Sequence, residues 1–204
     1  MSSEFQQLAT ELIDVGRQLY SMGMVPATSG NFSARLPDNN MAITVSGRHK
    51  GHLTHADIMR ADATGQSLDG NTPSAETLLH VQIYHRFPDA RCILHPHSVN
   101  ATLLSLLTDG DIELQDYEIL KAFPDINSHE CKVTVPVFAN DQDISRLATV
   151  VETRMANTAE RLHGYLIRGH GFYTWGNSVA DALRHVEAFE FLFDCEMRRK
   201  GVSR

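Results

Sequence analysis

Short apolar runs of strand length alternate in this chain with longer segments whose apolar residues recur every three or four positions. The short runs are typical of β-strands, and the wider spacing is typical of helices with one buried face. Strands are predicted over 31–35, 41–45, 90–94, 132–137 and 164–167. Helices are predicted over 5–22, 55–60, 74–84, 101–107, 144–155 and 178–193, with 101–107 buried. This alternation predicts an α/β sandwich with a central sheet covered by helices, without giving the strand order.

Composition favours a single domain over residues 1–204. A hydrophobic fraction of 42% is ordinary for a globular chain of 204 residues with one core. The formal net charge of −7 argues against nonspecific binding to nucleic acid, because the phosphate backbone would be repelled. A small anionic substrate is still compatible with this charge, since a local group of donors decides its binding.

The sequence also indicates the cellular compartment of the protein. Its apolar runs are too short to span a bilayer, and residues 1–5 lack the basic start and apolar centre of a signal peptide. Three cysteines cannot all pair, and Cys92 lies within a predicted core strand. Reduced thiols are the simpler interpretation, so we expect a cytoplasmic protein without membrane contact.

Three histidines are candidate metal ligands. His95 and His97 follow a predicted strand, and residues two apart in an extended chain project to the same side. His170 stands between two glycines, which permit a close approach of the backbone. Three imidazoles with a fourth position left for water or substrate are typical of catalytic zinc, although residue type also allows iron, manganese, cobalt or nickel. Surface or core histidines are the alternative, because the chain has 11 histidines.

Two glycine-containing turns are candidate phosphate sites. Thr28-Ser29-Gly30-Asn31 and the pair Ser46-Gly47 combine glycine with hydroxyl or amide groups, and so present several hydrogen-bond donors at once. Lys50, shortly after the second turn, could add a positive charge. Ordinary loops between strands are the alternative, because Ser-Gly pairs are common.

Carboxylates and a helix start complete the candidate site. The helix predicted from Ser74 has free N–H groups that favour an anion, although Ser74 could equally be an ordinary N-cap with Glu76 in the first turn. Near a metal, the Glu76 carboxylate would suit a proton carrier or an occasional ligand. Glu118, by its local pattern alone, is more typical of a solvated surface carboxylate.

From Leu12 to Met197 these motifs, in matching order, resemble the class II aldolase family, whose members act on small sugar phosphates with a metal ion. The resemblance rests on Thr28-Ser29-Gly30-Asn31, Ser46-Gly47, Ser74-Ala75-Glu76, His95-Pro96-His97 and Gly169-His170-Gly171. Segments 27–35, 117–121 and 168–176 are most similar to a dehydratase within the family that acts on a methylthio-substituted sugar phosphate. The resemblance implies an α/β/α sandwich with a mostly antiparallel central sheet.

The resemblance also implies roles for the candidate residues. His95, His97 and His170 would hold one Zn²⁺ ion per subunit. Glu118 would occupy the position of the dehydratase acid/base, and Glu76 matches the catalytic glutamate of the family's aldolases. The phosphate pocket would be lined by Asn31, Ser46, Gly47, Ser74 and Lys50. The family further implies a homotetramer with sites close to subunit contacts.

The chain departs from the family pattern at several points. Some dehydratases carry a cysteine at the position of Glu76, so the division of labour between Glu76 and Glu118 stays open. Ala75 replaces a serine that aldolases use on phosphate, so one donor is missing. The family's aldolases use a tyrosine in a C-terminal tail as an acid, whereas no tyrosine follows Tyr173.

The missing tyrosine argues against an aldolase and so favours dehydration. Aldol cleavage or epimerisation of another sugar phosphate, such as fuculose or ribulose phosphate, is the enzymatic alternative, because the same metal chemistry serves all three reactions. A non-enzymatic interaction module, as in cytoskeletal proteins with this fold, is the second alternative. Such a module would have no use for the complete set of histidines and glutamates.

Overall fold

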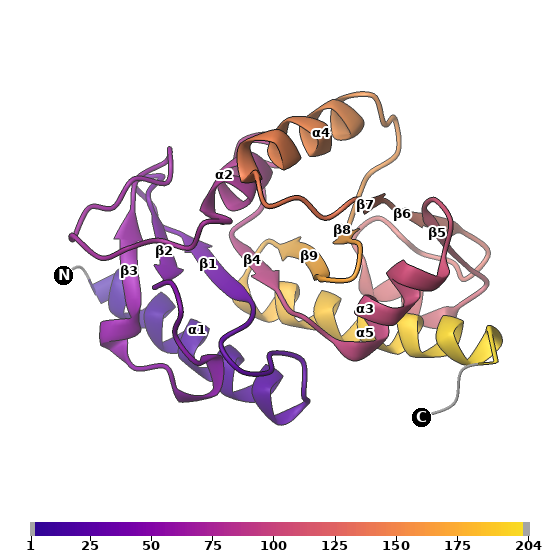
Figure 1. Ribbon diagram of the computed structural model, residues 1–204, viewed down its shortest axis with the longest axis horizontal. Coiled ribbons are helices and arrows are strands. Elements are labelled where there is room, and N and C mark those ends of the chain that lie inside the picture. Colours follow the sequence, from indigo (N-terminus) through magenta and orange to yellow (C-terminus); the bar gives the residue numbers. More distant parts are fainter. Residues whose placement is uncertain (1–2, 202–204) are drawn as a thin grey trace.

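The computed structural model describes residues 3–201 (Figure 1). The α-helices are α1 (Ser3–Ser21), α2 (Thr77–Arg86), α3 (Val99–Leu107), α4 (Ile144–Ala156) and α5 (Val179–Arg199). The strands are β1 (Asn31–Arg35), β2 (Met41–Thr44), β3 (Ile58–Ala61), β4 (Cys92–His95), β5 (Ile112–Gln115), β6 (Lys132–Val135), β7 (Val137–Phe138), β8 (Gly164–Ile167) and β9 (Gly171–Gly176). Short 3₁₀ helices are η1 (Lys50–His52), η2 (His55–Asp57) and η3 (Glu118–Ala122).

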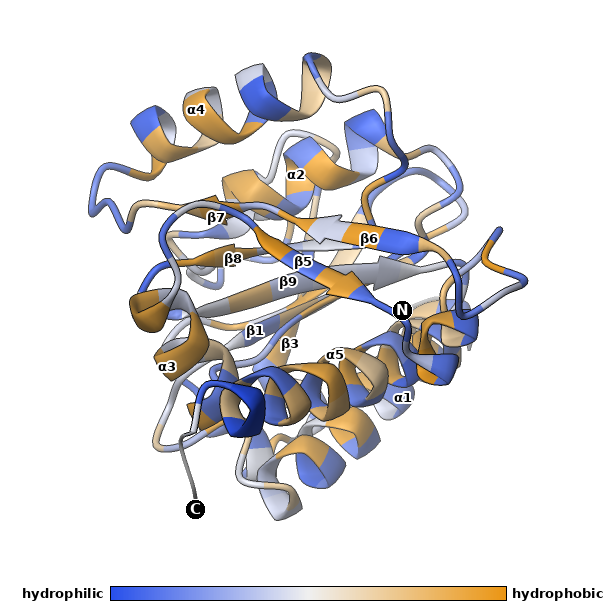
Figure 2. Cartoon of the chain, turned by 90° about the vertical axis from the view of Figure 1, so that its right-hand side faces the viewer, coloured by the Kyte–Doolittle hydropathy of each residue, from blue (hydrophilic) through white to orange (hydrophobic). Residues whose placement is uncertain are grey.

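A seven-stranded sheet forms the centre of the molecule, in the order β3-β2-β1-β4-β9-β8-β7. Neighbouring strands are antiparallel except β7 and β8, and β5 pairs with β6 in a separate antiparallel ribbon. Figure 2 shows α2 and α4 on one side of the sheet and α1, α3 and α5 on the other. The predicted α/β/α sandwich with a mostly antiparallel sheet is confirmed.

Two apolar cores hold the helices to the sheet, one on each face. Leu12 of α1 and Phe189 of α5 belong to one core, and Leu79 of α2 belongs to the other. Successive strand residues project to opposite faces, so Ile93 of β4 enters the second core while Leu94 enters the first. Strand β4 is therefore buried on both sides, which explains its continuous apolar run.

The centre of the sheet brings distant segments to one end of β4. Strands β1 and β4 are neighbours, and Asn31 pairs with His95. The turn between β8 and β9 carries His170, and β9 is the other neighbour of β4. A Cβ atom on Gly171 would lie 2.3 Å from the carbonyl oxygen of Pro96, so the close approach of these two segments depends on glycine.

Two predicted helices require correction. The chain over 55–60 makes only the single turn η2 and then enters β3, because pairing with β2 and burial of Ile58 and Met59 outweigh the local helix signal. The segment 101–107 does form most of α3, but this helix is not fully buried, since Leu103 and Leu106 are exposed.

The strand predictions were incomplete. Pro136 lies between β6 and β7, dividing the strand predicted over 132–137, because proline has no N–H to donate to a ladder. Strands β5 and β9 were not predicted. In the described part of the chain, residues 3–201, no helix has the length and apolar character needed to cross a membrane. The cytoplasmic location stays a prediction.

Candidate metal centre and adjoining cavity

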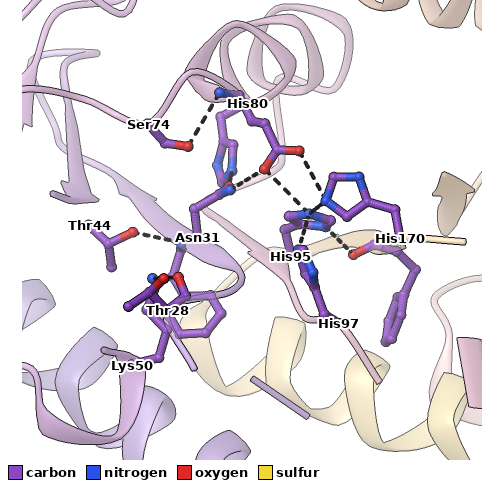
Figure 3. Close-up of polar contacts among 12 residues, drawn as sticks. Thr28, Asn31, Thr44, Lys50, Ser74, His80, His95, His97 and His170 are labelled. Carbon is purple, nitrogen blue, oxygen red and sulfur yellow. Dashed lines mark hydrogen bonds and ion pairs between the residues drawn. The ribbon is translucent and has the colours of Figure 1, made fainter. Parts of the chain in front are cut away.

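Four side chains from separate segments converge at the end of β4. Glu76, His95, His97 and His170 offer ligand atoms that all lie within 4.8 Å of one another, and Figure 3 shows the three histidine rings facing a common point. His95 ends β4, His97 follows it, and Glu76 is the N-cap residue of α2. The structure thus brings together the three histidines and Glu76, all of which were candidates from the sequence.

The spacing of the donor atoms fits a divalent metal ion. Nε2 of His95 lies 2.9 Å from Nε2 of His97 and 3.4 Å from Nε2 of His170. Nitrogen atoms bound tetrahedrally to zinc at its usual bond length would be about 3.3 Å apart. The Glu76 carboxylate reaches the same point, with Oε2 3.5 Å from Nε2 of His95 and Oε1 3.3 Å from Nε2 of His170.

Two of the histidines, His95 and His97, are held in the neutral form that metal binding requires. Burial lowers the pKa of His95 well below its usual range and the pKa of His97 to about 2, and neighbouring imidazoles add to both effects. Nδ1 of His95 donates to the backbone oxygen of Phe172 at 2.8 Å, so its Nε2 turns a lone pair to the cluster. The Tyr173 ring stacks on His95 at a centroid distance of 4.0 Å and fixes the plane of the imidazole.

A cavity of about 360 Å³ adjoins the cluster, large enough for a small ligand. Its wall contains the five residues predicted to line a phosphate pocket, which are Asn31, Ser46, Gly47, Lys50 and Ser74. Their binding of phosphate stays a prediction. A larger groove of about 1070 Å³ lies between α2 and α4 but contains none of the cluster residues, so the chemistry belongs to the smaller cavity.

The two glycine turns have the backbone conformations that glycine allows. Gly47 has a φ of +71° and forms an exposed turn with Ser46 after β2. Gly30 has a φ of +77°, and a Cβ atom there would lie 2.6 Å from the carbonyl oxygen of His95. The first turn therefore packs directly against the strand that carries the metal ligands.

Lys50 is not the free point charge that the sequence suggested. The residue is only 2% exposed, and its Nζ donates to the backbone oxygens of Thr28 at 2.9 Å and Arg48 at 2.6 Å. Burial lowers the pKa of Lys50 to about 8, although the negative charge of Glu76 opposes the change. Lys50 therefore ties the two glycine turns to each other, with one ammonium N–H left over.

Glu118 is the candidate that the structure does not bring to the cluster. It lies in η3 with a side chain 71% exposed, and it is not on the cavity wall. Its carboxylate accepts a hydrogen bond from Lys121 at 2.5 Å and lies 3.7 Å from His129. The hydrogen bond from Lys121 lowers the pKa of Glu118, with the Lys121 and His129 charges adding to it.

Two further residues at the site were missed from the sequence. His80 is fully buried beneath the cluster and contacts Asn31, whose Nδ2 donates to Glu76 at 2.6 Å. Tyr173 provides the ring that stacks on His95. His80 carries a usable signal, because it lies one helical turn after Glu76 and so shares its face of α2. No comparable signal distinguishes Tyr173 from other core aromatics.

Comparisons with known proteins agree with this geometry. Residues 10–197 match the family described as Class II Aldolase and Adducin N-terminal domain. The chain is 59% identical to a methylthioribulose-1-phosphate dehydratase of Methylococcus capsulatus, over 99% of this chain and 98% of that protein. It is 53% identical to a protein of the same name from Pseudomonas paraeruginosa over the full length of both. An L-fuculose-1-phosphate aldolase from Thermus thermophilus is similar in structure, with a TM-score of 0.76, 25% identity and coverage of 98% of this chain and 100% of that one.

Proposed function

Because this chain belongs to the Class II Aldolase and Adducin N-terminal domain family, we propose that it is a hydro-lyase that removes water from 5-methylthioribulose 1-phosphate. The product is 2,3-diketo-5-methylthiopentyl 1-phosphate, an intermediate of methionine salvage. The observation that carries this function is the cluster of three histidines and Glu76 beside a cavity bordered by two glycine turns. Full-length similarity to dehydratases supports this reaction over the other reactions of the family.

The proposed cofactor is one zinc ion per subunit, held by His95, His97 and His170. Zinc suits three neutral imidazoles with a further position left open, and the donor spacing of the cluster fits it. When bound, it supplies the Lewis acidity that polarises a substrate carbonyl. The turn at Ser46 and Gly47 borders the same cavity, and so does Ser74, which lies three residues before α2; these residues would receive the phosphate.

Two proton transfers must be performed by side chains of the protein. A base must take the proton from C3, and an acid must protonate the C4 hydroxyl so that it leaves as water; the enol that results relaxes to the diketone. In the proposed division of labour, Glu118 performs both transfers. Glu76, whose carboxylate is fixed by Asn31 at the cluster, holds its charge beside the reacting carbons.

Glu118 would have to come from a second copy of the chain. The side chain is exposed and absent from the cavity wall of its own chain, and its lowered pKa makes it a weak base there. Burial against another subunit would raise that pKa and so suit proton transfer. The helix α3, which begins two residues after His97, exposes Val99 and Leu106 and could form such a contact. A homotetramer is the proposed assembly.

The direct test is product analysis by mass spectrometry after the zinc-loaded protein is incubated with 5-methylthioribulose 1-phosphate. A product lighter by one water is expected. Cleavage into two smaller fragments would instead indicate an aldolase, and an isomer of unchanged mass would indicate an epimerase. Unchanged substrate with zinc in place would contradict the proposed activity, and a protein that binds no metal would favour the interaction module.

Complementation between subunits tests the origin of Glu118. The variants Glu118→Gln and His97→Ala should each be inactive, the first with zinc retained and the second without it. When the two variants are mixed and reassembled, about a quarter of the sites should combine an intact His97 with an intact Glu118 from another subunit. Activity that returns to this extent supports the shared site. Mixtures that stay inactive despite forming hybrid oligomers would show that Glu118 does not act across subunits.

A further inference from the structure

A row of buried polar side chains lies between β1 and α2, beneath the metal cluster. Asn31 and Ser33 are two residues apart on one face of β1, and Glu76, His80 and Tyr84 are four residues apart on one face of α2. These five residues, here called the polar seam, interlock in the order Glu76, Asn31, His80, Ser33, Tyr84. Asn31, Ser33, His80 and Tyr84 are buried, so their polar groups need hydrogen-bond partners.

The contacts form one unbroken chain. Asn31 Nδ2 donates to Oε2 of Glu76 at 2.6 Å, and the other end of the Asn31 amide contacts Nε2 of His80. Nδ1 of His80 lies 2.7 Å from Oγ of Ser33, which lies 2.8 Å from the hydroxyl of Tyr84. Figure 3 shows the Asn31 side chain reaching the His80 ring.

The direction of every hydrogen bond follows from the chemistry of the groups. The Asn31 amino group donates to the Glu76 carboxylate, which leaves the amide oxygen for His80. An amide oxygen only accepts, so Nε2 of His80 carries the proton. Burial lowers the pKa of His80 to about 3, which keeps the ring neutral and makes Nδ1 an acceptor. Ser33 therefore donates to His80 and accepts from Tyr84.

All four hydrogen bonds thus point toward the Glu76 carboxylate. We propose that His80 is a positioning residue for the reaction, which acts through Asn31 to hold the Glu76 carboxylate at the metal cluster, while Ser33 and Tyr84 fix the tautomer and orientation of its ring. Hydrogen bonds aligned in one direction polarise each other and strengthen the last member, the donation to the carboxylate. This inference rests on the proposed function for its effect on the reaction, but the arrangement itself can be tested without substrate.

The tautomer of His80 is the substrate-free test. Long-range ¹H–¹⁵N correlation spectra of the zinc-loaded protein should show the His80 ring neutral, with the proton on Nε2 and none on Nδ1. The His80→Gln variant lacks this imidazole, so the signals that disappear from its spectrum are assigned to His80. A proton on Nδ1, or a doubly protonated ring, would reverse or break the chain and overturn the inference whatever reaction the protein catalyses.

Steady-state kinetics test the effect on the reaction. His80→Phe keeps an aromatic ring but removes both hydrogen bonds, and it should lower kcat by about a hundredfold with little change in KM, because a small displacement of the Glu76 carboxylate beside the reacting carbons costs about that much. His80→Gln restores an N–H toward Asn31 and should recover part of the loss. A purely structural role would give both variants the same defect, and that result would contradict the inference.

A pair of tyrosine variants provides the matched control. Tyr84→Phe removes the hydroxyl that begins the chain, whereas Tyr165→Phe removes a buried hydroxyl of the same core for which the described residues offer no hydrogen-bond partner. Only Tyr84→Phe should reduce kcat, by several-fold, with zinc content unchanged. Equal kcat values for the two variants would overturn the inference. If the wild-type protein itself does not act on the substrate, the proposed function fails while the tautomer test still decides the arrangement.

Discussion

Lys50 illustrates how far a single residue can be interpreted from its sequence neighbours. Its place after a glycine turn suggested a positive charge for phosphate, and it does line the cavity. Its ammonium group is nevertheless bonded to the backbone oxygens of Thr28 and Arg48. Backbone carbonyls have no sequence signature, so a pattern of side chains could predict that Lys50 is near the site but not what it holds.

The buried charge of Lys50 should be visible in the pH dependence of stability. The pKa of Lys50 is about 8 in the folded chain against an ordinary value of 10.5, because burial disfavours the ammonium form. Between these values the unfolded chain binds a proton that the folded chain does not, so the free energy of unfolding rises with pH by at most about 1.4 kcal/mol per unit. Urea unfolding of metal-free protein should show this rise in the wild type but not in Lys50→Met.

The exposed Lys132 is the control for that measurement. It pairs with Glu113 at the surface, and the hydrogen bond to Glu113 raises its pKa rather than lowering it. Lys132→Met should therefore keep the wild-type rise between pH 8 and 10.5. A rise that persists in Lys50→Met would assign the effect to another group.

At the scale of elements, the predictions succeeded where the local pattern and the tertiary partner agree. Helix α1, predicted over 5–22, buries Phe5, Leu12 and Leu19, because a period near 3.6 places these apolar residues on the one face that meets the sheet. Strand β9 was missed because its run begins and ends in glycine and depends on pairing with β4 and β8. Strand β8 directly precedes β9 in the sequence, whereas β4 is far from it, and the local spacing of apolar residues cannot predict either pairing.

Helix α3 was predicted to be buried, but only one of its faces is buried in the single chain, and the other face is apolar and exposed. Its sequence is apolar on most sides, as in a core helix, yet Leu107 is 52% exposed within one chain. Contact with another subunit would satisfy both observations. Leu107→Glu should therefore lower the oligomer mass measured by light scattering, and reduce activity while zinc stays bound, because a charge in an apolar contact is costly.

Val150 on α4 provides the matched control for α3. It is 51% exposed, so Val150→Glu makes the same kind of change at nearly the same exposure on the other side of the sheet. This variant should keep both the oligomer mass and the activity of the wild type. An unchanged mass for Leu107→Glu would place the subunit contact elsewhere.

The whole molecule shows why the site was only partly predictable. The fold class follows from alternating patterns, and His95 with His97 follows from spacing two on a strand. The meeting of Glu76, Asn31 and His170 at the end of β4 depends instead on the strand order, which no local pattern contains. The position of Glu118 is harder still to predict, since its proposed place in the site requires more than one chain.

Buried neutral histidines make the stability of the whole molecule depend on pH. Burial lowers the pKa of His163 to about 4 and that of His80 to about 3, against an ordinary value of 6.5. As the pH falls below 6.5, these two imidazoles bind protons in the unfolded chain but not in the folded chain. The free energy of unfolding should therefore fall by up to about 2.7 kcal/mol per pH unit for these two residues together, and the fall should end near their folded pKa values.

Urea unfolding of metal-free protein between pH 7 and pH 4 measures that fall. His163→Phe preserves an aromatic ring stacked on Phe123 but cannot be protonated, so it should reduce the slope by about half the amount that His80 and His163 contribute together. His85→Phe, at an exposed position on α2, should leave the slope unchanged. A slope that is the same in His163→Phe and the wild type would show that acid instability arises from other groups.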